Sequence, residues 1–544
     1  MPEASVPTSG PTHPSAGRRR IVLLLGVLGL LYAAGLNGHW RFQRDSARYM
    51  ALARSLAEDG TYRFNGRPHT LVWPGFPAML APVYMAAGQS FLAMNALLSL
   101  LGLGAVAAAW ALYRELPLNA RQAAVCTLLF GFSRTLYYYS SHIMSDVPFT
   151  VFALITLLCG TIMLRSPGRT AWLWCAAASV TAAAACFIRP VGPVLPIALV
   201  SAVWLTPGVR RGRLAAGRTL MILVPVLAAG FAWNVRTAMV REPNSFTYFD
   251  VFIERHTLRE TVLGMAVRAP RIVDALPDAV LGLDVGWSLG LLMAVAMAMG
   301  LATALRRGER LACTYGVVYL ATICLAAPGR RFLLPALPVL IYWLVLGMHS
   351  AAAVVQHHRP ALSPRRAAVV GHVLLALAVG TNLTRISKLV YEARAPGFYE
   401  RIEDGRLPDY FALTAWLRDN ATARDVVFAR EHETVHYFSR VRTRRAGPGW
   451  ERDPLGFLGR TDVTLVVRDP DKDAGWEHLP HLMRARPDVF EPVARFGRLE
   501  VLRLHREALP RAPDAAAPAP PSSGGTTTSS GRTGDESPEM PPAS

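Results

Sequence analysis

The chain has 544 residues, of which 52% are hydrophobic and only 17% are charged. This composition is too apolar for a soluble protein of that length with an ordinary polar surface, so it indicates a membrane protein. The formal charge of +19 comes from arginines in short loops between apolar runs. Because they form no single basic stripe, the charge indicates membrane topology and not a nucleic-acid-binding surface.

The two ends of the chain are predicted to be disordered. Residues 1–17 are rich in Pro, Ser, Thr and Gly, and residues 506–544 are dominated by Pro, Ala, Ser, Gly and Thr. Three arginines at 18–20 precede the first apolar run, as in a signal peptide, but no clear A-x-A cleavage site follows. We therefore expect an uncleaved anchor with a cytoplasmic amino terminus, which opens a transmembrane domain over 18–394.

Repeated apolar runs in this domain predict a mainly α-helical bundle with about eleven membrane spans. The expected spans are 21–36, 91–113, 121–139, 147–164, 171–187, 190–206, 218–237, 287–305, 311–327, 332–349 and 367–387. Arginine-rich loops come at every second connection, as the positive-inside rule expects of cytoplasmic loops. The alternate connections are then expected on the outer side of the membrane.

Two long loops are expected on this outer side, namely 37–90 and 238–286. Within the first, the segment 71–88 is apolar but short for a span and contains three prolines. If this segment crossed the membrane, every later loop would change sides and the arginine-rich loops would lie outside. The segment is therefore interpreted as a re-entrant or interfacial helix.

The composition changes over 395–505, after the last span. The segment LPDYFALTAWLRDN has helical periodicity, DVVFAR and DVTLVV have the composition of strands, and EPVARFGRLEVLRL fits a hairpin. We expect a small extracytoplasmic α/β domain.

Charged side chains at membrane depth are costly, so those at the outer ends of spans are candidates for function. They are Asp45, Asp146, Arg189, Arg236, Arg330 and Arg331. Guanidinium groups match the geometry of phosphate oxygens, and a carboxylate can accept a proton from a hydroxyl group. The set suits an anionic, lipid-linked substrate.

Five segments resemble, in their order and spacing, the GT-C superfamily of membrane glycosyltransferases, which includes protein O-mannosyltransferases and the aminoarabinose transferases that modify lipid A. The segments are RDSARYMALARSLAEDGTYRFNGRPHTLVWPGFPAML, SHIMSDVPF, FIRPVGPVLP, WNVRT and GRRFLLPALPVLIYW. The resemblance covers the chain from about residue 20 to residue 505. It implies transfer of one sugar from a polyprenyl-phosphate carrier.

The resemblance also implies roles for single residues. Asp45, in the D-x-x-x-Y that ends at Tyr49, matches the catalytic base of the family, and Asp146 in S-D-V-P-F matches a second acidic residue that assists at the site. His69 precedes W-P-G-F-P, where the family often has a basic residue that meets the lipid phosphate.

The late G-R-R-F-L-L-P segment matches the R-Y/F-x-x-P element of the family, so Arg330 and Arg331 are the expected phosphate clamp. Arg189, Arg236 and His69 are the further candidates for this contact.

Each candidate also has a purely structural explanation. The two aspartates can cap helices, Arg189 and Arg236 can be interfacial anchors, and one arginine of the 330–331 pair can be topological. His142 and Tyr137–Tyr139 fit an aromatic belt at the membrane interface.

Two other functions compete with sugar transfer. His432, Glu433 and His436 spell H-E-x-x-H, the zinc-metalloprotease signature, with Glu451 and His478 as the nearest candidates for a third ligand. A lipid transporter or flippase without chemistry is the other alternative, but the hydropathy shows no inverted repeat of the kind that transporters have.

The sequence therefore predicts an inverting glycosyltransferase of the bacterial inner membrane. Its partners are a polyprenyl-phosphate sugar donor, membrane lipids and a lipid, glycan or protein acceptor, with no nucleic acid. The six cysteines lie in apolar runs, so no disulfide framework or Cys-based metal site is predicted. No metal ligands are assigned, and a requirement for a divalent metal is left open.

Overall fold

The computed structural model describes residues 14–207, 212–241, 258–326, 329–358, 364–402, 405–447, 450, 452–470 and 478–509. Most of the two segments predicted to be disordered lies outside these ranges. Where the predicted segments overlap the described residues, the chain is helical: α1 begins at Pro14, and a 3₁₀ turn covers Arg506–Ala508.

Within the described residues, seven helices are long and apolar enough to cross a membrane. They are α4 (Phe91–Glu115), α7 (Asp146–Arg165), α8 (Gly168–Ile188), α10 (Gly212–Val240), α13 (Trp287–Arg306), α16 (Leu337–His358) and α17 (Pro364–Arg394). Each coincides with a span expected from the sequence. The mainly α-helical membrane architecture is confirmed.

Shorter apolar helices occupy three more of the expected spans. They are the apolar part of α1, Ile21–Gly35 within Pro14–Gly35, together with α9 (Val194–Leu205) and α14 (Leu311–Ala326). At 1.5 Å per residue, the 12 residues of α9 reach only about 18 Å, which is shorter than the apolar core of a bilayer.

The prediction of one span over 121–139 is wrong, because the chain forms two helices there. α5 (Ala120–Gly131) ends before Ser133, whose hydroxyl caps α6 (Arg134–Ser140) by accepting a hydrogen bond from the Leu136 amide. Ser133 also donates to the carbonyl of Ala279. The hydroxyl thus accepts a hydrogen bond from a backbone amide in the first turn of α6, where the amides have no helical acceptor.

The connection 37–90 is folded throughout. α2 (Arg44–Asp59) is followed by a two-stranded hairpin, β1 (Arg63–Phe64) with β2 (Arg67–Pro68), and by α3 (Gly75–Ala87). α3 corresponds to the apolar segment 71–88.

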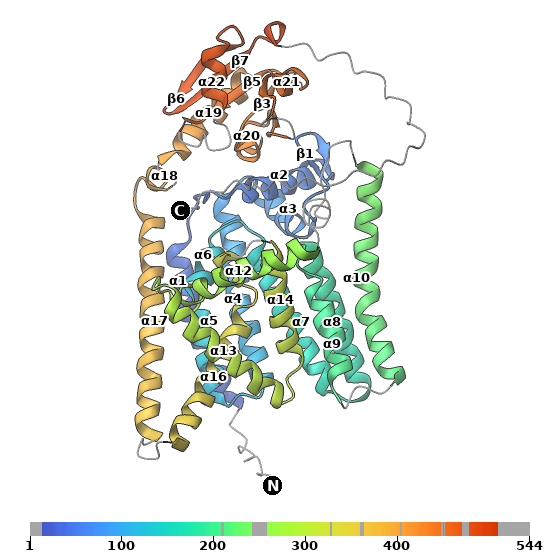
Figure 1. Cartoon of the computed structure of the whole chain (residues 1–544), viewed down its shortest axis with the longest axis vertical. Helices are drawn as coiled ribbons and strands as arrows, with labels where there is room; N and C mark the ends of the chain where they lie inside the picture. Colours follow the sequence, from blue (N-terminus) through green and yellow to red (C-terminus); the bar gives the residue numbers. More distant parts are fainter. Residues whose placement is uncertain are drawn as a thin grey trace, which may run out of the picture.

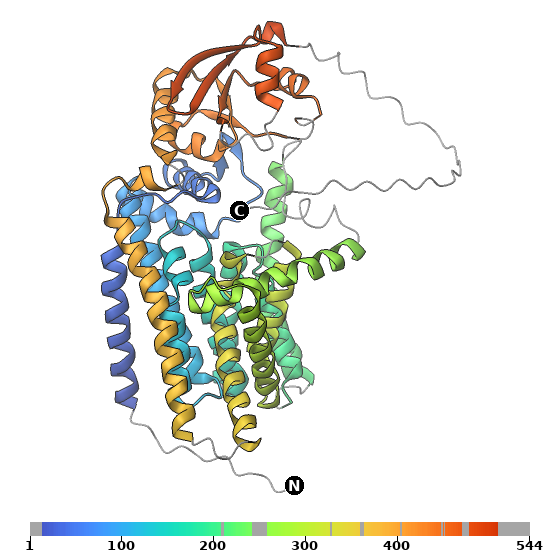
Figure 2. The same ribbon diagram turned by 60° about the vertical axis from the view of Figure 1, so that its left-hand side comes forward.

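The connection 238–286 is only partly a loop, which corrects the sequence-based expectation. α12 (Leu258–Leu281) occupies much of it, and 242–257 lies outside the described residues. α12 lies across the bundle instead of along it (Figures 1 and 2). Its exposed apolar side chains, such as Val267, alternate with charged ones, such as Arg268, which is typical of an interfacial helix.

Two short helices lie between longer elements in the last part of the chain. They are α15 (Arg330–Leu333), between α14 and α16, and α18 (Phe398–Arg401), after α17.

After the bundle, a five-stranded sheet has the strand order β4-β3-β5-β7-β6. The strands are β3 (Val426–Phe428), β4 (Arg442–Arg444), β5 (Leu465–Arg468), β6 (Phe490–Phe496) and β7 (Leu499–Leu504). β3 pairs in parallel with β4 and β5, and the β6–β7 hairpin joins the sheet antiparallel to β5. The predicted strands and hairpin all occur, whereas β4 was not predicted.

Two apolar layers cover the faces of this sheet. Val427 packs with Leu413 of α19 (Leu407–Asn420) and Val435 of α20 (His432–Ser439), while Val426 and Phe428 face the opposite cluster. That cluster includes side chains from α21 (Pro454–Gly459) and α22 (His478–Ala485). Alternate residues of β3 therefore serve opposite layers, as in a small α/β domain.

The sheet stands at one end of the bundle, with α2 and α3 between it and the long helices (Figures 1 and 2). We call this the sheet end. Arginine-bearing connections meet at the other end, where Arg165 pairs with Glu309 at 2.5 Å and Arg307 donates to the carbonyl of Pro117 at 2.9 Å. Connections that the sequence predicts on one side of the membrane thus lie together.

By the positive-inside rule, we expect the arginine-bearing end to be cytoplasmic and the sheet end to face outward. A reporter active only outside the cytoplasm, fused after Arg394, should be active, and the same reporter fused after Gly308 should be inactive. The reverse result for both fusions would refute this orientation.

Candidate functional site

Asp45 lies in the first turn of α2, at the sheet end of the bundle, and its side chain is 43% exposed. The carboxylate accepts hydrogen bonds from both terminal nitrogens of Arg331, at 3.3 and 3.4 Å. One helical turn later, the hydroxyl of Tyr49 lies 3.0 Å from that of Ser145. Asp45 and Tyr49 therefore lie on the same face of α2, toward the bundle.

Asp146 begins α7 and is completely buried. One carboxylate oxygen accepts from Arg189, and the other accepts from Nε of Arg331 at 2.9 Å. The two aspartates and two arginines form one connected group, which we call the four-charge cluster (Asp45, Asp146, Arg189, Arg331). The cluster joins four of the residues singled out in the sequence, although they are up to 286 positions apart.

Three different structural devices bring these residues together. Asp45 and Asp146 each lie in the first turn of a helix, where the positive end of the helix dipole stabilises a carboxylate. Arg189 follows the last residue of α8, and Arg331 lies in α15. Because α7, α8 and α15 all present an end here, the charges gather at the sheet end and not within the bundle.

Gly75 of the W-P-G-F-P segment determines how closely α3 approaches the site. A Cβ atom at this position would lie 2.6 to 2.8 Å from backbone atoms of Phe187 and Ile188, at the end of α8. Only glycine allows this approach, which fixes the chain directly before Arg189. The segment therefore supports an arginine of the cluster.

One aromatic side chain lies close to both arginines of the cluster. The guanidinium carbons of Arg189 and Arg331 lie 5.5 and 5.6 Å from the centroid of the Phe332 ring. The ring face is electron-rich and attracts cations. Phe332 therefore attracts both guanidinium groups to one ring.

Arg330 belongs to a different ion pair, although it is adjacent to Arg331. It binds Asp278 of α12, which also pairs with Arg134 at 3.3 Å. Asp278 is buried, whereas the Arg330 side chain is 51% exposed. The two adjacent arginines thus have different partners in the structure. Arg331 belongs to the four-charge cluster, and Arg330 pairs with Asp278 of α12.

His69 and Arg236 lie together, but no contact of theirs reaches the four-charge cluster within the described residues. Arg236 donates to the carbonyl of His69 at 2.7 Å, and its guanidinium lies 4.9 Å from the ring centroid of Trp233. Burial, with the charges of Arg48 and Arg236, lowers the pKa of His69 to about 3. A neutral ring that accepts a hydrogen bond from the Val72 amide is poorly suited to neutralise a phosphate.

The H-E-x-x-H residues lie on α20, where both ring nitrogens of His436 and the carboxylate of Glu433 have protein partners. Nδ1 of His436 lies 2.9 Å from the carbonyl of Val441, and its Nε2 accepts from the Asn65 amide at 3.2 Å. Because a carbonyl only accepts, Nδ1 carries the proton and the lone pair of Nε2 is already used. Burial lowers the pKa of His436 to about 4, so the ring is neutral.

The glutamate of the motif is also engaged. Glu433 pairs with Arg48 of α2 and with Nδ1 of His432, the latter at 2.9 Å. Burial raises the pKa of Glu433, but His432 and Arg48 outweigh it and lower the pKa to about 2. Of the candidate third ligands, Glu451 and the His478 side chain lie outside the described part. Within that part, no group of three His, Cys, Asp or Glu side chains is placed to hold a metal.

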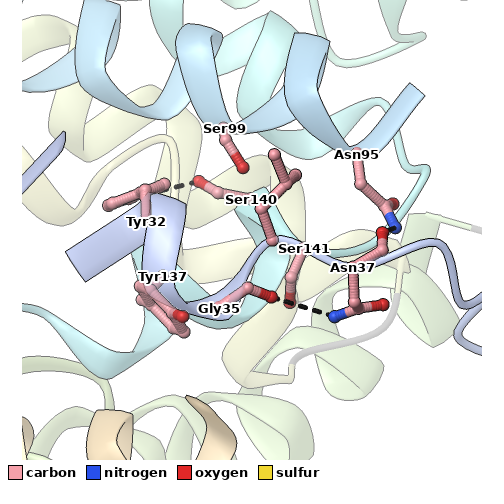
Figure 3. A pocket seen from close by; sticks show the side chains of 9 residues that line it. Tyr32, Gly35, Asn37, Asn95, Ser99, Tyr137, Ser140 and Ser141 are labelled. Atoms are coloured by element: carbon pink, nitrogen blue, oxygen red, sulfur yellow. Dashed lines mark hydrogen bonds between the residues drawn. The ribbon is translucent and has the colours of Figure 1, made fainter. Parts of the chain in front are cut away.

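A small pocket with no charged residue in its lining lies beside α1, α4 and α6 (Figure 3). It is lined by residues that include Asn37, Asn95, Ser99 and Ser141, and its volume of about 10 Å³ is close to that of one water molecule. Asn37 donates to the carbonyl of Gly35 at 2.9 Å. The pocket is too small for a sugar or a phosphate.

Sequence reasoning missed Arg48, Asp278 and Phe332. Asp278 was assigned to a loop, although apolar residues at helical spacing in 258–281 indicate an amphipathic helix. Arg48 lies between Asp45 and Tyr49 of the quoted motif, but its partner is in another part of the chain. Phe332 stands beside the arginine pair in the sequence.

The contacts of α20 generate a prediction about metal content. Protein purified without added zinc or chelator should contain well under one zinc per chain, and His432→Ala should not change that content, because Glu433 and His436 already have protein partners. Elemental analysis by mass spectrometry measures both. If wild-type protein contains one zinc per chain and His432→Ala loses it, the metalloprotease interpretation would be supported again.

No protein-family model and no curated protein sequence matches the chain. Solved structures of membrane proteins do resemble it. ArnT from Cupriavidus metallidurans, in its apo state, superposes with a TM-score of 0.59 and 16% identity over 91% of this chain and 100% of that protein. The same protein bound to undecaprenyl phosphate gives a TM-score of 0.57 and 16% identity, over 89% of this chain and 98% of that one.

A more distant match is the oligosaccharyltransferase AglB from Archaeoglobus fulgidus, in complex with an inhibitory peptide and a dolichol-phosphate. It has a TM-score of 0.55 and 12% identity, over 83% of this chain and 69% of that protein. ArnT, an aminoarabinose transferase, and AglB are both GT-C enzymes. Identities this low establish architecture alone. The chain therefore has the fold of the GT-C membrane glycosyltransferases.

Proposed function

We propose that this protein transfers a sugar from a polyprenyl-phosphate donor to an acceptor hydroxyl at the outer face of the membrane, with inversion at the anomeric carbon. The observation that carries the proposal is the four-charge cluster, in which a half-exposed carboxylate and two arginines meet at the sheet end of the bundle. The binding of undecaprenyl phosphate by ArnT and of dolichol-phosphate by AglB supports a lipid-phosphate donor.

Arg331 is the group best placed to bind the donor phosphate. Its Nε bonds to Asp146, while its two terminal nitrogens point to the exposed Asp45. A phosphate can replace Asp45 at the terminal nitrogens and bind in the two-pronged geometry that guanidinium groups favour. Asp146 keeps its hydrogen bond to Nε, so no buried charge is left without a partner.

The same exchange prepares the proposed base. Asp45, released from Arg331, accepts the proton of the acceptor hydroxyl as its oxygen attacks the anomeric carbon. The bond from that carbon to the phosphate oxygen breaks, and its electron pair stays on the phosphate. Arg331 and Arg189 stabilise the added negative charge. Attack from the face opposite the phosphate inverts the anomeric carbon.

Asp146 has a different role in this scheme. Both of its oxygens bond to arginines, and its side chain is completely buried. It therefore orients Arg189 and Arg331 and does not contact the acceptor.

The test is to incubate purified protein with a panel of polyprenyl-phosphate sugars and acceptors and to measure the release of free polyprenyl phosphate. We expect one donor to be consumed. Asp45→Asn should then lower the rate about 10²- to 10⁴-fold, because it removes the general base.

The control is Asp59→Asn, at the exposed carboxyl end of the same helix, which should keep the wild-type rate. If no donor is consumed by wild-type protein, the proposed function is wrong. If a donor is consumed equally by wild type and Asp45→Asn, only the role of Asp45 is wrong.

The separation of the two adjacent arginines gives a second prediction. Arg331→Ala should raise the KM for the donor about tenfold or more, since hydrogen bonds between charged groups contribute roughly 1.5–3 kcal/mol each. Arg331→Lys should restore binding only in part, because lysine lacks the planar fork. Arg330→Ala, which removes the pair with Asp278, should change the donor KM less than about threefold. Equal effects of the two alanine variants would contradict the assignment.

A further inference from the structure

The side of α2 that faces away from the bundle is held by the sheet domain. Four contacts run along the helix from its first turn to its last. They are Arg44 with Glu431 at 3.1 Å, Arg48 with Glu433, Arg54 with the carbonyl of Tyr437 at 2.8 Å, and Glu58 with Arg440 at 3.1 Å. All four partners belong to α20 or to the residues that flank it.

The four contacts differ in how far water can reach them. The side chains of Arg48 and Glu433 are only 12% and 1% exposed, whereas those of Arg440 and Glu58 are 59% and 39% exposed. Removing one partner of a buried ion pair leaves an unpaired buried charge, while exposed pairs contribute little. Of these two ion pairs, the buried Arg48–Glu433 pair therefore contributes more to holding this side of α2.

The hairpin that follows α2 extends the same attachment. Asn65, at its turn, has a left-handed backbone with φ of 59°. Its side chain donates to the carbonyl of Thr443 and accepts from the Thr443 amide at 2.7 Å, and its own amide donates to His436. Two residues of the H-E-x-x-H segment, Glu433 and His436, thus bind the α2–hairpin unit.

The buried pair lies close to the proposed base along the helix. Arg48 is three residues after Asp45 and next to Tyr49, so the three side chains occupy adjoining positions within one turn of α2. Asp45 and Tyr49 contact the bundle, through Arg331 and Ser145. A rotation or shift of α2 that broke the Arg48 pair would displace Asp45 as well.

We propose that Glu433 is a positioning residue, which holds α2 so that Asp45 lies over Arg331, and that the H-E-x-x-H segment serves as a docking element and not as a metal site. The inference rests on the proposed function for its link to catalysis. A misplacement of about 1 Å can lower an enzymatic rate roughly 10²-fold. The sheet domain is therefore part of the catalytic apparatus, although none of its residues contacts the four-charge cluster within the described chain.

The experiment compares Glu433→Gln with Glu58→Gln. Both substitutions remove a carboxylate from an ion pair between α2 and the α20 region, but Glu58 is exposed and 13 residues, or about 20 Å, along the helix from Asp45. Glu433→Gln should lower kcat about tenfold or more and change the donor KM less than about threefold. Glu58→Gln should leave both within about twofold of the wild-type values.

A double-variant cycle tests whether Glu433 acts through Arg48. If the two residues form one unit, Arg48→Gln/Glu433→Gln should lose no more activity than the worse single variant. If the activity loss of the double variant equals the product of the two single losses, the residues act independently and the proposal is overturned. If Glu433→Gln does not fold, Glu433→Asp keeps the charge and should give an intermediate kcat, and a wild-type kcat there would also count against the proposal.

Hydrogen exchange tests the positioning step without any substrate. In Glu433→Gln, amides of α2 should exchange about tenfold faster or more than in wild type, while those of α4 and α7 should not change. Unchanged exchange in α2 together with unchanged kcat would overturn the proposal. If wild-type protein consumes no donor, the proposed function fails, and the exchange of α2 still decides whether Glu433 holds this helix.

Discussion

The pairing of Asp146 with two arginines is the interaction on which the sheet end of the bundle depends. A carboxylate with no exposed surface is costly unless each oxygen has a charged partner. Arg189 comes from the end of α8 and Arg331 from the short helix before α16, so one side chain joins segments that are far apart in the sequence. Apolar burial drives little helix association in lipid, which leaves packing and polar contacts of this kind to fix the helix ends.

The shared position of Arg331 explains how one cluster can serve both structure and chemistry. Its bond to Asp146 is buried, while its bonds to Asp45 lie where that carboxylate is 43% exposed. A ligand can compete for the exposed side without disturbing the buried one. The stable half of the cluster keeps the guanidinium oriented, so the proposed exchange of Asp45 for a phosphate requires no rearrangement of the bundle.

The sequence predicts structural features that depend on hydropathy, such as spans. It does not predict features that depend on one contact with a residue far away in the sequence. Most spans were recognised because lipid selects for apolar length, and the helix over Leu407–Asn420 was recognised from its periodicity. The break at Ser133 was missed because a capping hydroxyl hardly changes hydropathy. Arg330 and Arg331 are equivalent in the sequence. Only their partners in the fold distinguish them, since Arg330 pairs with Asp278 and Arg331 pairs with Asp45 and Asp146. H-E-x-x-H has the spacing of a zinc site, but Asn65 and Arg48, 371 and 385 positions earlier, bind Nε2 of His436 and Oε1 of Glu433.

The charges on α2 also specify the rotation of the helix about its axis. Arg44 and Arg48 face carboxylates of the sheet domain, and Asp45 faces arginines of the bundle. Successive residues differ by about 100° around a helix. A turn of that size in one sense would bring Asp45 toward the carboxylates, and a turn in the other sense would bring Arg44 toward Arg331, so like charges would meet in either case. Attraction thus holds the helix in one orientation, and repulsion disfavours the rotated orientations. Both the bundle and the sheet domain must therefore be in place before Asp45 is positioned.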